Sequence, residues 1–219
     1  MQPHTRPARR LRALPLALVL TLSLAASAAA AQDLYDSPAD KQPHFRKVLA
    51  RIQIQQPTLR AFVQHKTLAK LNRTLRSSGL LLISPKGVCW RNETPFASAM
   101  RMTPAGIENA RPGEPVRFDR ADASADIQKL VTIMLALFSA DEAQLKRAFQ
   151  FYFTGDDTRW TIGFKPSRRE LRRLITAVEL SGTRDVEKIV IREASGDVSE
   201  IHVALPPPGQ TLTLEQCIE

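Results

Sequence analysis

Few side chains beyond the first thirty residues have the types and spacing that catalysis requires. The three histidines there, His44, His65 and His202, form no i, i+4 pair of the metal-binding kind. We find no Gly-x-Ser-x-Gly elbow, phosphate loop or dinucleotide fingerprint in the sequence. Aspartates beside Gly155 and Gly196 fall in turn-type sequences, where aspartate is favoured for backbone reasons. We therefore expect no enzyme, no metal and no cofactor.

Cys89 and Cys217 are the two cysteines of the chain. Cys89 falls in an expected strand without a paired histidine, so a nucleophilic role is not expected. In an exported protein the two could form a disulfide across a long loop, worth roughly 4 kcal/mol on the chain-entropy model. Two free, buried thiols are the alternative, because the sequence does not give the distance between them.

Four arginines follow Pro166 and form the densest charge after the leader. One interpretation is a solvated helical turn. The other is a docking patch for acidic lipid headgroups or for an acidic partner protein. The four residues are Arg168, Arg169, Arg172 and Arg173.

The first 31 residues have the organisation of a secretory signal peptide. Arginines up to Arg12 precede an apolar run at 14–24 and small residues at 25–31, with cleavage expected before Gln32. The apolar run is short for a membrane span, and an uncleaved N-terminal anchor is the alternative. We therefore predict a signal peptide at 1–31 and a soluble, exported domain at 32–219.

The charge of the chain does not indicate a nucleic-acid partner. The formal net charge is +9, but the leader holds four of the 31 basic and none of the 22 acidic residues, which leaves +5. Such a small excess of positive charge does not predict strong binding to a polyanion such as nucleic acid. Hydrophobic residues make up 43% and charged residues 24%, which excludes wholesale disorder.

Hydrophobic periodicity predicts one helix followed by strands in the first half of the domain. Apolar residues at helical spacing predict an amphipathic helix over about 38–54, ending before Pro57. Residues 107–121, rich in proline, are expected to form a loop or an irregular strand. Apolar and polar residues alternate at 59–69, 74–84, 88–93 and 98–103, which predicts strands.

The second half of the domain begins with helices and continues with strands. Residues 123–139 predict a helix that is apolar on more than one face, and Asp141 is expected to cap a short helix to about Arg147. Strand patterns return at 149–153, 160–164, 174–180, 186–193 and 201–205.

These elements predict a protein that is mainly β with some α. We count nine to eleven strands and two or three helices. A sheet of this size with one apolar face must curl, and its concave face must be filled by helices, side chains or ligand. The expected fold is an unclosed antiparallel β-barrel, capped by helices, around an apolar cavity.

Short motifs in this chain resemble, in order and spacing, the LolA-type outer-membrane lipoprotein carriers. The resemblance spans about 45–205. The early motifs are Phe62-x-Gln64-x-Lys66-x-Leu68, Ser77-Ser78-Gly79-Leu80 and Gly87-Val88-Cys89-Trp90. The later motifs are Phe153-Thr154-Gly155-Asp156, Trp160-Thr161-Ile162, Pro166, Val178-Glu179-Leu180-Ser181-Gly182, Ser195-Gly196-Asp197 and Ile201-x-Val203.

The resemblance implies a carrier whose apolar cavity holds the acyl chains of lipoproteins. It implies a periplasmic location between two partners: an inner-membrane ABC transporter like LolCDE and an outer-membrane acceptor like LolB. A monomer is expected.

One departure from the family pattern concerns the arginine that such carriers place on the strand before the tryptophan. The corresponding segment, Ile83 to Gly87, lacks it, and Lys86 is a loose substitute. A carrier of another envelope lipid or of an aryl-polyene-type molecule is therefore an alternative. A periplasmic sensor of mislocalised lipoproteins is another.

The residues expected to contact cargo are apolar residues chosen by alternation on the strands or by position on the helix at 123–139. Plain core packing is the alternative for each. They are Leu81, Ile83, Val88, Trp90, Met100, Met102, Leu130, Met134, Leu137, Phe138, Phe151, Trp160 and Ile162.

Overall fold

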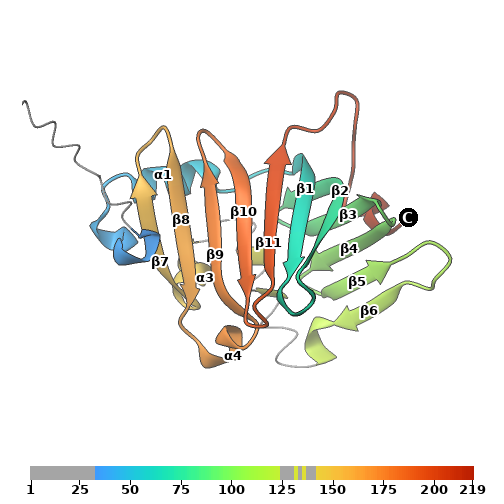
Figure 1. Ribbon diagram of the computed structural model, residues 1–219. Helices are drawn as coiled ribbons and strands as arrows, with labels where there is room; N and C mark the ends of the chain where they lie inside the picture. Colours follow the sequence, from blue (N-terminus) through green and yellow to red (C-terminus); the bar gives the residue numbers. More distant parts are fainter. Residues whose placement is uncertain (1–32, 124–130, 133–134, 137–141) are drawn as a thin grey trace, which may run out of the picture. The chain divides into compact units, whose positions relative to one another are not determined.

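The computed structural model describes residues 33–123, 131–132, 135–136 and 142–219, which belong to one unit, Gln32–Glu219. The expected signal peptide at 1–31 lies outside the described residues. The described chain forms one antiparallel sheet of eleven strands in the order β6-β5-β4-β3-β2-β1-β11-β10-β9-β8-β7 (Figure 1). β6 and β7 form its two edges, so the sheet does not close within the described residues. The fold is the predicted one, mainly β with some α.

Two meanders, β1 to β6 and β7 to β11, make up the sheet. The ladder between β1 and β11 joins them, with Ala61 opposite Ala204 and Thr67 opposite Val198. The strands are β1 Thr58–Leu68, β2 Arg73–Ser84, β3 Gly87–Thr94, β4 Ser98–Thr103, β5 Gly106–Ala110, β6 Arg117–Arg120, β7 Phe149–Gly155, β8 Trp160–Pro166, β9 Ile175–Gly182, β10 Val186–Glu193 and β11 Val198–Ala204.

Three short α-helices accompany the sheet in the described part of the chain: α1 Phe45–Ile52, α3 Glu142–Lys146 and α4 Arg169–Arg172. α1 is shorter than the predicted 38–54, because Pro43 disfavours the helical conformation at Gln42, which is extended. The residues before it form a separate 3-10 turn, η2 (Ala39–Lys41).

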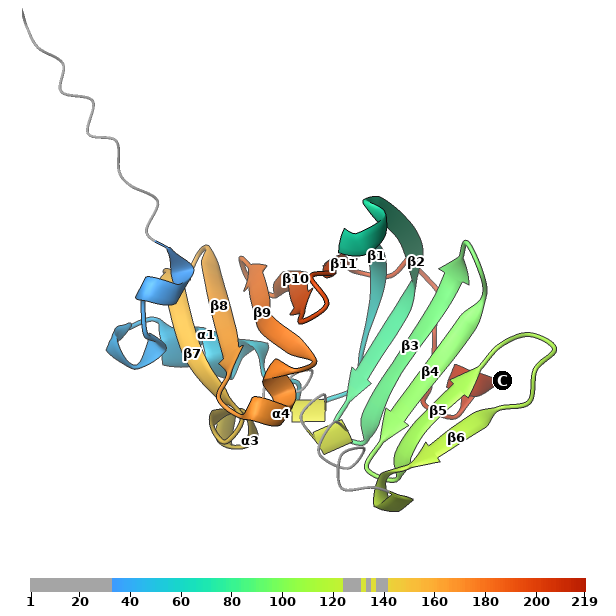
Figure 2. The ribbon, with the colours of Figure 1, turned by 60° about the horizontal axis from the view of Figure 1, so that its bottom comes forward.

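The inner face of the sheet packs against α1. The helix buries Phe45, Val48, Leu49 and Ile52, its whole apolar stripe. The Phe45 ring lies 5.7 Å from that of Phe151 and 6.0 Å from that of Phe153, between ring centroids, so the helix begins over β7. In Figure 2, α1 and α3 lie beside β7 and β8.

The outer face of the sheet is covered by the C-terminal segment. Leu212 and Cys217 pack there against Leu80 and Leu82 of β2 and Cys89 of β3. The 3-10 turn η5 (Gln216–Ile218) contacts β3, β4 and β5 (Figure 2). A disulfide joins Cys89 to Cys217. The segment therefore gives the first meander a second, smaller apolar cluster on the side away from α1.

Most of the predicted strands are present, with shifts of a few residues at their ends. Residues 107–121 differ from the prediction of a loop or irregular strand, because they contain most of β5 and all of β6, paired in regular register. Most of the helix predicted at 123–139 lies outside the described residues. Between 124 and 141 the structure describes four residues, and all four are helical: Val131, Thr132, Leu135 and Ala136.

Candidate apolar binding site

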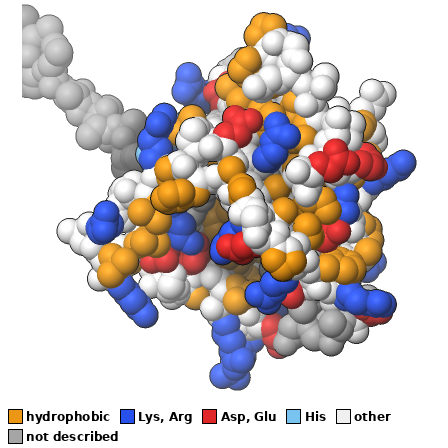
Figure 3. Space-filling view, turned by 90° about the vertical axis from the view of Figure 1, so that its right-hand side faces the viewer, with side chains coloured by type: hydrophobic (Ala, Val, Ile, Leu, Met, Phe, Trp, Pro, Cys, Tyr) orange, Lys and Arg blue, Asp and Glu red, His pale blue; other side chains and the backbone are white. Residues whose placement is uncertain are grey.

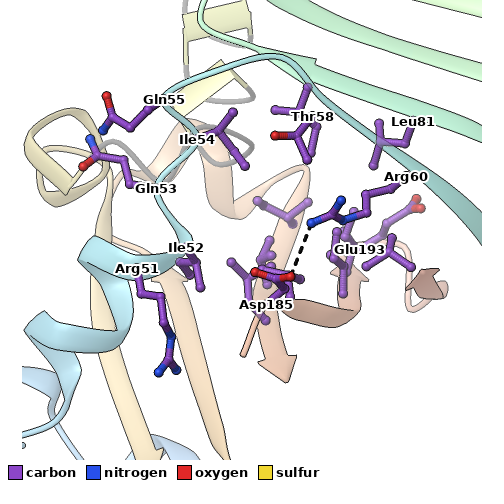
Figure 4. Close-up of a pocket in the computed structure, with 18 of the residues that line it drawn as sticks. Arg51, Ile52, Gln53, Ile54, Gln55, Thr58, Arg60, Leu81, Asp185 and Glu193 are labelled. Carbon is purple, nitrogen blue, oxygen red and sulfur yellow. Dashed lines mark hydrogen bonds and ion pairs between the residues drawn. The ribbon is translucent and has the colours of Figure 1, made fainter. Parts of the chain in front are cut away.

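A cavity of about 540 Å³ lies on the inner face of the sheet, among β1, β2, β9, β10, β11 and the chain that follows α1 (Figure 4). This volume lies within the usual range of small-molecule sites, about 300–1,000 Å³. We call it the aliphatic cavity, because no aromatic side chain occurs among its described lining residues. Its apolar lining consists of Ile52, Ile54, Leu81, Ile83, Leu174, Ile175, Val178, Leu180, Val186, Ile189, Ile191 and Val203.

Strand alternation explains this lining. Ile189 and Ile191 of β10 point to the same face as Val178 and Leu180 of β9, because register pairs Ile189 with Leu180 and Ile191 with Val178. Several lining side chains, such as Ile191, are only partly buried. Apolar surface that remains open inside a fold is the surface that a hydrophobic ligand would cover.

An ion pair lies at the aliphatic cavity. Arg60 of β1 extends toward Asp185, with 3.5 Å between Nη2 and Oδ2 (Figure 4). Asp185 is 59% exposed, so the pair contributes little to stability. Both residues line the cavity, so the pair adds a charged part to a wall that is otherwise mainly aliphatic.

The β7–β8 and β9–β10 turns hold α1 in place beside the cavity. Asp157 of the β7–β8 turn accepts hydrogen bonds from Lys47 and His44, which lower the pKa of its carboxyl. Arg51 donates to the carbonyl oxygens of Asp157 and Thr183, both at 3.0 Å. His44 and Lys47 thus hold the start of α1, and Arg51 holds its end, where Arg51 and Ile52 line the cavity.

A second cavity of about 720 Å³, the polar cavity, lies on the inner face between β1, β3, β4, the β5–β6 hairpin, β10 and β11. Trp90 and Met100 are on its wall, together with amide, hydroxyl and charged side chains. Ile191 and Glu193 line both the polar and the aliphatic cavity, so the two adjoin along β10. A third cavity of about 400 Å³ lies among η2, α1, α3 and β7.

The residues expected to contact cargo are distributed over several environments. Leu81 and Ile83 line the aliphatic cavity, Trp90 and Met100 the polar cavity, and Phe151 the third cavity. Four others are at most 3% exposed and line none of the three: Val88, Met102, Trp160 and Ile162. Leu130, Met134, Leu137 and Phe138 lie outside the residues whose side chains the structure describes.

The lining from β9, β10 and β11 was missed by sequence reasoning. The signal was present, because alternation in 186–193 and 201–205 places Ile189, Ile191 and Val203 on one apolar face. Alternation alone does not tell which part of that face is covered by a helix and which part stays open.

The other candidate groups lie away from the aliphatic cavity. Cys89 and Cys217, the disulfide partners, are on the outer face. Arg168, Arg169, Arg172 and Arg173 are all exposed around α4. Arg168 Nε donates to the carbonyl oxygen of Arg147 at 3.2 Å. Within the described ranges, no cluster of three or more His, Cys, Asp or Glu side chains has the arrangement of a metal site.

The surface carries separate exposed apolar side chains. Phe96 in the β3–β4 turn is 82% exposed and Leu71 in the β1–β2 turn is 63% exposed. On the face drawn in Figure 3, hydrophobic side chains are interspersed with Lys, Arg, Asp and Glu. None of the helices among the described residues has the length and apolar content needed to span a membrane.

Comparison with known proteins finds similar structures. No protein-family model and no curated protein sequence matches the chain. The chain is similar to a LolA superfamily protein from Nitrosomonas europaea, with 10% identity and a TM-score of 0.43 over 80% of this chain and 97% of that one. It is also similar to a putative outer membrane lipoprotein-sorting protein domain from Vibrio parahaemolyticus, with 8% identity and a TM-score of 0.40 over 76% and 92%.

A third similar structure is a DUF1329 family protein from Desulfovibrio piger, with 9% identity and a TM-score of 0.40 over 74% of this chain and 90% of that one.

Proposed function

We propose that this domain is a lipid-binding carrier that holds the acyl chains of lipoproteins in the aliphatic cavity. The observation that carries the proposal is the cavity itself: about 540 Å³, on the inner face of an open sheet, with a mainly aliphatic lining. Burial of an acyl chain is worth about 0.8 kcal/mol per methylene, so such a cavity suffices for binding without any reactive group.

The proposal extends to location and partners. If residues 1–31 direct export, the carrier works in the periplasm, between an inner-membrane transporter like LolCDE and an outer-membrane acceptor like LolB. The sequence motifs that resemble LolA-type carriers support this role. It is a transfer role rather than an enzymatic one, and the carrier acts as a monomer.

Val203 provides the test of the cavity. Val203→Glu places a carboxylate among the aliphatic side chains, which is costly for an unpaired charge and unfavourable for an adjacent acyl chain. We expect the affinity for a fluorescent fatty-acyl probe to fall at least about tenfold, equivalent to about 1.4 kcal/mol. The measurement is a fluorescence titration of the purified protein.

Ala204→Glu is the matched control, because Ala204 is the next residue on β11, is exposed and points to the outer face. Circular dichroism establishes that both variants fold. Equal probe affinity in wild type and in the folded Val203→Glu variant would show that the aliphatic cavity is not the binding site.

A further inference from the structure

The inner face of the sheet changes from apolar to polar where the two cavities adjoin. Along β11, Val203 lines the aliphatic cavity, Ile201 is buried and Ser199 lines the polar cavity. Along β10, Ile189 lines the aliphatic cavity, and Glu193 lines both. A ligand lying along these strands would therefore meet apolar side chains at one end and polar ones at the other.

Strand register shows that this boundary crosses several strands. Lys66 of β1 lies opposite Ser199 of β11, which lies opposite Ile191 of β10. One step further into the apolar half, Gln64 lies opposite Ile201, which is only 1% exposed. At this boundary, β1 thus supplies the polar side chains Gln64 and Lys66, whereas the neighbouring β10 and β11 supply the aliphatic side chains Ile191 and Ile201.

The charges that face the polar cavity are paired among the described residues. Lys66 Nζ lies 2.6 Å from Glu193 Oε1, and Arg117 Nη2 lies 3.3 Å from Asp119 Oδ1. A third, looser pair joins Arg111 and Glu114 at 3.9 Å. Three cations and three anions therefore face this cavity. A ligand group with net charge would be attracted to one member of each pair and repelled by the other.

Neutral hydrogen-bonding groups make up the rest of the polar wall. Asn92 Nδ2 donates to Ser98 Oγ at 3.0 Å, and Gln64 Nε2 donates to Ser199 Oγ at 3.2 Å. Asn92 Oδ1 also accepts from Trp90 Nε1 at 3.2 Å, and Gln64 Oε1 accepts from Ser77 Oγ at 3.3 Å. Since each amide has two N–H groups and an oxygen with two lone pairs, one N–H and one lone pair of each remain for a ligand. Hydroxyl groups, which both donate and accept, fit such a wall best.

We propose that the two cavities form one site for an amphiphile, whose alkyl or acyl chain lies in the aliphatic cavity and whose uncharged, hydroxyl-bearing head lies in the polar cavity. The head is of the sugar or glycerol type. This inference rests on the proposed carrier function and specifies its ligand class.

The test compares amphiphiles that share one chain length and differ in the head. An alkyl glucoside, an alkyl phosphocholine, an alkyl carboxylate and an alkyl trimethylammonium are titrated by calorimetry below their micelle concentrations. We expect the glucoside to bind at least about tenfold more tightly than each of the other three. Equal affinities, or tighter binding of a charged or zwitterionic head, would overturn the amphiphile proposal and leave the carrier proposal standing. No binding of any of the four would contradict the carrier proposal itself.

Asn92 allows the head site to be tested separately from the chain site. We expect Asn92→Leu to weaken the glucoside about tenfold and to leave the carboxylate unchanged, because the substitution removes hydrogen-bonding groups from the polar wall only. Thr94→Val on the same strand, outside both cavities, is the matched control and should change neither affinity. Equal weakening of glucoside and carboxylate in the folded Asn92→Leu variant would contradict a separate head site.

Discussion

At the scale of single residues, alternation on a strand indicates the face on which a side chain lies but not its environment. Ile83 is partly buried and lines the aliphatic cavity, whereas Val88, on the same face and paired with Ile83, is 1% exposed in the packed core. The difference depends on which neighbouring side chains fill the space above each residue. These neighbours come from distant parts of the chain, so the local sequence pattern does not predict them.

Asp156 gives a prediction at this scale. Its carboxylate accepts hydrogen bonds from the backbone N–H and hydroxyl of Thr158, at 2.6 and 2.7 Å, and from the backbone N–H of Arg159. These bonds lower its pKa to about 2 from an ordinary value of about 3.9. Folding therefore favours the ionised form, and the stabilisation is complete above about pH 4 and is lost as the pH falls toward about 2.

We expect Asp156→Asn to lower the melting temperature at neutral pH, because a neutral acceptor makes weaker bonds than a carboxylate. The difference from wild type should shrink between about pH 4 and pH 2, where wild type loses the same charge. Thermal melts across this range measure it, with Asp36→Asn, an exposed aspartate in another turn, as the control. A difference that stays constant with pH would contradict the role of the ionised carboxylate.

At the scale of elements, strands with an apolar face were predictable and strands without one were not. β7 and β8 alternate apolar and polar residues, and both were predicted. Most of β5 and all of β6 fall in 107–121, which was predicted as a loop or an irregular strand, because neither strand has a regular apolar alternation. They are defined by backbone pairing at the edge of the sheet. The part of the aliphatic cavity that β9 to β11 line was also not predicted. It stays open because α1 packs over β7, and the position of α1 on the sheet does not follow from strand alternation.

The exposed arginines around α4 provide a prediction for an element. If they dock on an acidic surface, Arg172→Glu with Arg173→Glu should reduce binding to anionic vesicles, because each basic residue near such a surface contributes about 1 kcal/mol. Lys41→Glu with Arg46→Glu, a pair that is also exposed, makes the same change in net charge elsewhere. Vesicle co-sedimentation measures the effect. An equal loss in both double variants would indicate net charge rather than a docking patch, and an acyl-probe titration shows whether the cavity is intact.

At the scale of the whole molecule, the pairing that joins the two meanders could not be predicted from the sequence. Alternation gives the face of each strand but not its partner, so the pairing of β1 with β11 had no local signal. The disulfide had no local sequence signal either. Cys89 and Cys217 are 128 residues apart in the sequence, and this separation does not indicate their distance in space. What could be predicted was the fold class: a large, open, antiparallel sheet with an apolar inner face.

The disulfide gives a prediction at this scale. Since Cys89 and Cys217 enclose a long loop, Cys217→Ser should lower the free energy of unfolding by about 4–5 kcal/mol, measured by urea denaturation. Affinity for the acyl probe should be retained, because the bond lies on the outer face. Reduction with dithiothreitol is the control. It should destabilise wild type but not the variant, and an equal shift in both would exclude the disulfide as the cause.

The ladder between β1 and β11 has a consequence for the order in which the protein is made. β1 is an early part of the domain and β11 a late one, so the two meanders cannot join until residues 198–204 have been synthesised. Until then, the inner faces of both meanders are incomplete and their adjoining edges unpaired. Contacts between segments so far apart in sequence also slow folding. We therefore expect a chain that lacks β11 to be prone to aggregation.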